Sequence, residues 1–95
     1  DPILADEAKE VGLGAEVAPK GEAGEVAMGI AQRIAQNAPL AVAASKQLVQ
    51  LATGVSEAEF WEAQEPLQRS VFTSDDAKEG PRAFAEKRAP EWTGS

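Results

Sequence analysis

Apolar side chains recur at intervals of three and four residues along most of this chain, and this spacing limits the possible folds more than any other feature. The stretch 21–39 carries such a stripe at Ala23, Val26, Ala27, Ile30 and Ile34. A stripe of this period marks one face of an amphipathic helix, whereas a half-buried strand alternates apolar and polar residues. Because no convincing alternating run of strand length occurs, the sequence predicts an all-α segment.

The first 20 residues contain shorter elements. A short helix is predicted over 5–12, with acidic residues near its start and Gly12 at its end. A short extended piece is expected to follow over 13–19, closed by Pro19. The next helix should stop at Asn37, which precedes Ala38-Pro39, because the residue directly before a proline avoids the α region.

The stretch 39–54 predicts a helix that is apolar on most of its sides. Pro39 suits the first helical position and Gly54 suits the end. One face is expected to carry Leu40, Ala44, Leu48 and Leu51, and a second face Val42 and Val49. A helix with two apolar faces is typical of the centre of a bundle or of an interface.

The stretch 56–72 begins with a capping box, in which Ser56 and Glu59 satisfy free amides of the first turn. Pro66 lies inside the apolar pattern and cannot donate to the carbonyl of Glu62. We therefore expect a kink at Pro66, or two shorter helices.

The last stretch also reads as helical. Cap residues follow Phe72, and the dipeptide Gly80-Pro81 is expected to separate one short helix from the next. Pro90 should halt the final helix.

Size and composition exclude several function classes. A chain of 95 residues forms at most one small domain. It has no cysteine and no histidine, which removes disulfides, thiolate metal sites and the commonest general base. The net charge of −7 argues against non-specific binding of nucleic acid. The apolar runs are too short for a membrane span, and the acidic start does not resemble a signal peptide. A cytoplasmic location fits this pattern, and the start on Asp1 without a methionine suggests a piece of a longer protein.

Paired carboxylates are the candidates for acid–base chemistry. Glu62 and Glu65 are three residues apart, as are Asp76 and Glu79, so each pair can share a helix face. A solvated acidic surface explains both pairs better than catalysis does, since surface acids are common. With no suitable glycine-rich loop and no nucleophile beside a base, no catalytic residue and no metal ligand is predicted.

The two tryptophans are the largest apolar side chains. Trp61 follows a helical stripe, and burial in a core is the favoured interpretation. Trp92 lies after the last predicted helix. It is expected to dock either on its own domain or on a partner subunit, and the sequence does not choose between them.

The stretch 75–92 concentrates basic residues in an acidic chain. Phe84 and Lys87 are three residues apart, which predicts that they project from the same side of a helix. One interpretation is that basic residues near a helix end complement its dipole and reach its free carbonyls. The alternative is a site for an anionic aromatic ligand, in which Phe84 stacks and Lys87 contacts a phosphate.

Three motifs are similar to the C-terminal part of the enoyl-CoA hydratase (crotonase) superfamily. They are "DPILADEAKEVGL", "NAPLAVAASKQLV" and the closing "SDDAKEGPRAFAEKRAPEW". The last is the most specific, and it matches the family's signature at Ser74, Asp76, Glu79, Gly80, Ala83, Phe84, Glu86, Lys87, Arg88 and Pro90. The sequence departs from the family at Gly14 and Ala18, where β-branched residues are usual.

The resemblance implies a crotonase-type α/β spiral fold, of which this chain is the C-terminal helical trimerisation region. Residues 1–20 would be the end of the core domain, a helix plus a short extended piece, and residues 21–95 the helical oligomerisation region. The subunit would form a homotrimer or a dimer of trimers. No nucleic acid or membrane partner is implied.

The resemblance also implies a function. Such enzymes bind acyl-CoA thioesters, and hydratases use two glutamates to add water to trans-2-enoyl-CoA in fatty acid metabolism. Those glutamates and the oxyanion loops would lie upstream, so these 95 residues alone would be inactive. The residues that match Phe84 and Lys87 contact the adenine and phosphate end of coenzyme A, which is bound as a thioester substrate rather than as a covalent cofactor. The alternatives are a helical oligomerisation module without its own ligand, or the tail of a related isomerase, hydrolase or dehalogenase.

Overall fold

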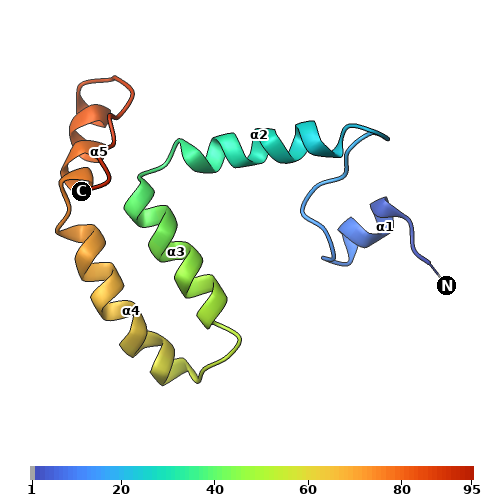
Figure 1. The fold of residues 1–95 in the computed structure, drawn as a ribbon, viewed down its shortest axis with the longest axis horizontal. Helices are drawn as coiled ribbons and strands as arrows, with labels where there is room; N and C mark the ends of the chain where they lie inside the picture. Colours follow the sequence, from blue (N-terminus) through green and yellow to red (C-terminus); the bar gives the residue numbers. More distant parts are fainter. Residues whose placement is uncertain (1) are drawn as a thin grey trace. The chain divides into compact units, whose positions relative to one another are not determined.

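The computed structural model describes residues 2–95, and this part of the chain is all-helical, as predicted (Figure 1). The five helices are α1 (Ala5–Glu10), α2 (Ala23–Ala35), α3 (Pro39–Leu51), α4 (Glu57–Phe72) and α5 (Asp75–Ala85). The chain divides into two compact units, and the division falls between Arg33 and Ile34. Each unit is described by itself.

The first unit contains α1, which ends at Glu10, and the predicted end signal, Gly12, lies in the turn that closes the helix. Gly12 has a φ of 84°, the left-handed conformation that glycine adopts without steric cost. Leu13 N donates to the Ala8 carbonyl at 2.8 Å, and Gly12 N donates to the Lys9 carbonyl at 3.1 Å. This bond pair is the Schellman motif, which satisfies the last carbonyls of a helix. The predicted extended piece over 13–19 forms no strand.

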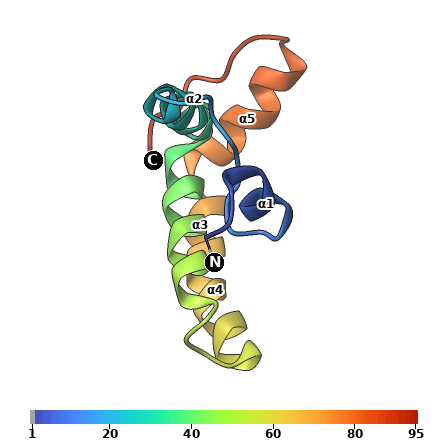
Figure 2. The same cartoon turned by 90° about the vertical axis from the view of Figure 1, so that its right-hand side faces the viewer.

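The second unit is built on α3 and α4, which run antiparallel and side by side (Figures 1 and 2). The predicted inner face of α3 is confirmed, since all four of its members are half-buried: Leu40, Ala44, Leu48 and Leu51. On the second predicted face, Val42 is half-buried but Val49 is exposed. The apolar pattern of α3 therefore exceeds what α4 covers within this unit.

The cap signals are confirmed, but two predicted breaks are not. Ser56 Oγ accepts from Glu59 N at 3.2 Å at the start of α4. Both α4 and α5 continue through an internal proline, Pro66 and Pro81 respectively. The predictions of two helices around Pro66 and of a separation at Gly80-Pro81 are thus wrong. Each proline removes only one hydrogen bond, and the remaining turns with their caps maintain the helix. A kink at Pro66 stays a prediction.

Burial is limited within this chain. Ala83 is the one buried apolar residue among residues 2–95. The prediction that Trp61 lies in a core is wrong for this chain, because its side chain is 57% exposed. Its ring meets that of Phe60 edge-to-face at 5.5 Å, and its Nε1 donates to Glu57 at 3.4 Å. Both contacts are local, since Phe60 adjoins Trp61 in the chain and Glu57 precedes it by four residues. Over residues 2–95, no helix has the length and apolar character needed to cross a bilayer.

Candidate functional site

The start of α5 is fixed by a serine cap and by the end of the chain. Ser74 Oγ accepts from Ala77 N at 3.2 Å, which satisfies one free amide of the first turn. Asp76 N donates to the Ser95 carbonyl at 3.1 Å. The last residues of the chain therefore return to the beginning of α5, and we call residues 88–95 the returning tail.

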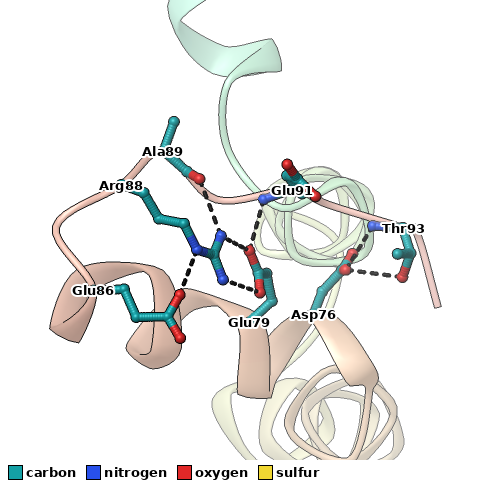
Figure 3. Close-up of polar contacts among 7 residues, drawn as sticks. All are labelled: Asp76, Glu79, Glu86, Arg88, Ala89, Glu91 and Thr93. Atoms are coloured by element: carbon teal, nitrogen blue, oxygen red, sulfur yellow. Dashed lines mark hydrogen bonds and ion pairs between the residues drawn. The ribbon is translucent and has the colours of Figure 1, made fainter.

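Asp76 holds the far end of the returning tail. Its carboxylate accepts from Thr93 N at 2.7 Å and from Thr93 Oγ1 at 3.1 Å (Figure 3). It also accepts from Gly94 N at 2.9 Å. The residue is only 3% exposed. The Thr93 N–H, more than any other group, lowers the pKa of Asp76 below its usual value. Asp76 is thus an ionised side chain with most of its oxygen lone pairs engaged.

Glu79 holds the near end of the returning tail. Its two oxygens accept from the two terminal nitrogens of Arg88 at 2.6 and 3.0 Å, a bidentate ion pair (Figure 3). Glu91 N donates to the same carboxylate at 2.8 Å. The Arg88 hydrogen bond is the main reason that the pKa of Glu79 falls to about 2. Arg88 Nε also donates to Glu86 at 2.6 Å, and both carboxylates raise the pKa of Arg88.

The prediction of a solvated acidic surface is wrong for one of the two carboxylate pairs. Asp76 is buried and the Glu79 side chain is only 13% exposed, so this pair is not a solvated acidic face. The amides and the guanidinium of the returning tail replace water around both carboxylates. The other pair is solvated as predicted: Glu62 is exposed, and Glu65 makes one exposed contact with Arg69 at 2.8 Å.

Trp92 docks on its own chain. Its Nε1 donates to the Gln36 carbonyl at 2.8 Å. Its ring also lies over Gly80, where an added Cβ would be 3.5 Å from the nearest ring atom. Of the two partners that the sequence left open, these contacts select the chain itself. They also fix the middle of the returning tail between the Asp76 and Glu79 contacts.

The turn after α5 places Lys87 outside the helix. Lys87 N donates to the Phe84 carbonyl at 3.2 Å, and Arg88 N donates to the Ala83 carbonyl at 3.0 Å. This is the same Schellman motif that ends α1, but with lysine at the left-handed position, where φ is 56°. The prediction that Phe84 and Lys87 share one side of a helix is therefore wrong, because α5 ends at Ala85.

The two predicted site residues are nevertheless both accessible. Phe84 is 86% exposed, and Lys87 is exposed. Within residues 2–95 the Lys87 ammonium forms no ion pair, whereas Arg88 is bound by two glutamates. Arg82, in the last turn of α5, fits the helix-dipole interpretation. An exposed ring and a free cation near one turn suit an anionic aromatic ligand.

The sequence did not predict that Asp76 and Glu79 bind the returning tail. The sequence shows Asp76, Glu79 and Arg88 only as charges, because their joint role depends on contacts that span 9 to 18 residues. The available signal was the spacing of Asp76 and Glu79, which places both carboxylates on neighbouring turns. No local pattern indicated that the tail would return to them.

Comparison with known proteins identifies the family. The family model described as "Enoyl-CoA hydratase/isomerase" matches residues 1–95. Enoyl-CoA hydratase EchA19 of Mycobacterium tuberculosis is 48% identical over 88 residues, which are 93% of this chain and 33% of that protein. Carnitinyl-CoA dehydratase of Proteus mirabilis is 41% identical over 98 residues, covering 95% of this chain and 36% of that protein.

Solved structures agree with these matches. A crystal structure of enoyl-CoA hydratase from Mycobacterium tuberculosis H37Rv superimposes with a TM-score of 0.91 and 42% identity, covering 100% of this chain and 38% of that one. Enoyl-CoA hydratase EchA1 from Mycobacterium marinum gives a TM-score of 0.91 and 41% identity, with the same coverage of 100% and 38%. The chain spans about a third of the length of the curated relatives it matches, 33% and 36% for the two above. The resemblance drawn from the three motifs is confirmed, and this chain belongs to the enoyl-CoA hydratase/isomerase (crotonase) family.

Proposed function

We propose that this chain is the C-terminal part of an acyl-CoA lyase, an enoyl-CoA hydratase that adds water to trans-2-enoyl-CoA. The observation that carries the proposal is the family match over residues 1–95 together with 48% identity to a protein named enoyl-CoA hydratase. The chemistry would come from two glutamates and an oxyanion hole supplied by the rest of the subunit. The protein would act in fatty acid metabolism in the cytoplasm.

The proposed role of this segment at the substrate is to bind coenzyme A. Phe84 would stack on the adenine ring, and Lys87 would contact a phosphate. Three features support this role: the ring is 86% exposed, the ammonium has no ion-pair partner within residues 2–95, and the turn between them is hydrogen-bonded. A phosphate needs such a local positive charge, because the chain as a whole carries a net charge of −7.

The second proposed role is subunit contact, in a homotrimer or a dimer of trimers. Residues 21–95 would form the oligomerisation region and residues 1–20 the end of the core domain. Large apolar side chains stay exposed on this segment, among them Val49 and Phe72. Exposed apolar surface of this kind is typical of an interface.

A second candidate activity is favoured by one comparison. Several relatives at about 40% identity are named carnitinyl-CoA dehydratase, and dehydration is the reverse of hydration. The proposed coenzyme A contacts would be unchanged in that case. Assaying the full-length protein with both an enoyl-CoA and the corresponding hydroxyacyl-CoA distinguishes the substrate preference.

The test uses the full-length protein and crotonyl-CoA. Hydration should be seen as loss of the ultraviolet absorbance of the conjugated thioester, and residues 1–95 alone should show no turnover. Lys87→Ala should weaken coenzyme A binding roughly 10- to 150-fold, the effect of losing one charge-assisted hydrogen bond. Lys78→Ala removes the same charge from an exposed position on α5 and should leave the affinity unchanged. Unchanged affinity in Lys87→Ala would instead favour a helical oligomerisation module without its own ligand.

A further inference from the structure

Lys87 lies in a conformation that its own side chain disfavours. It is the only non-glycine residue with a positive φ among residues 2–95. The equivalent position at the end of α1 is occupied by Gly12, with a φ of 84°. Since lysine has a Cβ, a left-handed backbone at this position carries a steric cost that the surroundings must outweigh.

In addition to the two Schellman bonds, side-chain contacts hold this conformation from the C-terminal side of Lys87. Arg88, the next residue, is bound in a fork by Glu79 at 2.6 and 3.0 Å, and Glu91 N adds a third bond to the same carboxylate. A bidentate guanidinium–carboxylate pair fixes orientation as well as distance. The far end of the tail is held separately by Asp76 (Figure 3). The direction in which the chain leaves α5 is therefore set by side chains and not by the Schellman bonds alone.

We propose that the Glu79–Arg88 ion pair is a positioning device for Lys87, which holds the ammonium in the place where it meets a phosphate of coenzyme A. This inference rests on the proposed function of Lys87. Glu79 and Arg88 themselves are occupied by each other and by the tail, so they act through Lys87 rather than on the ligand. Neither is a catalytic residue.

The physical basis is preorganisation. With the pair intact, the backbone of Lys87 is already fixed before the ligand arrives, so binding does not have to order it. Without the pair, the turn can relax toward negative φ, and coenzyme A must then order it again. The expected loss of affinity is about 5- to 30-fold, which corresponds to fixing the backbone of one residue.

The test is a double-mutant cycle in the full-length protein, with coenzyme A as the ligand and calorimetry as the readout. Glu79→Gln keeps the side-chain shape and removes the charge. It should weaken binding about 5- to 30-fold when Lys87 is present and less than about twofold when Lys87→Ala is also present. Glu65→Gln breaks the exposed Glu65–Arg69 pair on α4 and should change the affinity in neither background.

The outcomes separate the two proposals. If Lys87→Ala alone leaves the affinity unchanged, the proposed function of Lys87 fails, and the positioning role fails with it. If Lys87→Ala weakens binding but Glu79→Gln weakens it equally in both backgrounds, or not at all, only the positioning role is overturned.

A second variant covers the case in which Glu79→Gln does not fold. Arg88→Lys retains the positive charge at a residue whose side chain is 35% exposed, but lysine cannot form the fork. It should show the same dependence on Lys87. An affinity loss that does not depend on Lys87, or no loss, would overturn the inference equally well.

Discussion

Replacing Lys87 with glycine should stabilise the protein while it weakens coenzyme A binding. The reason is the φ of 56° at this residue, which glycine adopts freely and lysine does not. The same Schellman turn at the end of α1 already uses Gly12. The proposed phosphate contact explains why lysine is nevertheless suited to this position.

The magnitude follows from two opposing terms. A left-handed backbone costs a residue with a Cβ roughly 1–2 kcal/mol, and Lys87→Gly removes that cost from the folded state. Glycine also has more conformational freedom in the unfolded chain, which stabilises the unfolded state by about 0.5–1 kcal/mol and offsets part of the gain in the folded state. The net expectation is a rise of about 0.5–1 kcal/mol in the free energy of unfolding. Affinity for coenzyme A should fall roughly 10- to 150-fold, as in Lys87→Ala.

The assay is urea unfolding of the full-length protein, with Lys78→Gly as the matched control. Lys78 lies inside α5, where glycine should lower the free energy of unfolding by about 0.5–1 kcal/mol. Its long 4.0 Å contact with Asp75 is exposed and contributes little. Replacing lysine with glycine should therefore raise the free energy of unfolding at Lys87 and lower it at Lys78. A loss of stability in Lys87→Gly equal to that in Lys78→Gly would refute the argument from backbone conformation.

Two further predictions concern the ends of α5. Ser74→Ala should lower the free energy of unfolding by about 1 kcal/mol, because the bond from Ala77 N and the bond to the Val71 carbonyl are both lost, and Ser74→Thr, which keeps the hydroxyl, should restore most of it in the same urea assay. Glu79 has a folded pKa of about 2 against an ordinary value of 4.5, so its contribution to stability is present above about pH 4.5 and disappears as the pH falls toward 2. Unfolding measured between pH 5 and pH 2 should therefore be less pH-dependent in Glu79→Gln than in the unsubstituted protein, and equal slopes would contradict the ion pair with Arg88.

Much of the fold was predictable because its signals are local. Apolar spacing gave the positions of α2, α3 and α4, and the cap residues Ser56 and Ser74 mark the starts of α4 and α5. Two proline signals misled in the same way. Pro66 and Pro81 disfavour a helix interior, but one missing hydrogen bond did not outweigh the turns on either side. A proline costs a helix interior roughly 3 kcal/mol, and the remaining turns and caps of α4 and α5 outweigh that cost.

The sequence by itself determined the helical class, the family signature and the choice of Phe84 and Lys87 as candidate ligand contacts. Only the tertiary structure decided that the tail returns to α5 and that Asp76 and Glu79 bind it. The physical reason is the separation along the chain over which each interaction acts. Periodicity and caps act over three or four residues, whereas a carboxylate loses its water only when amides and a guanidinium from a distant part of the chain replace it.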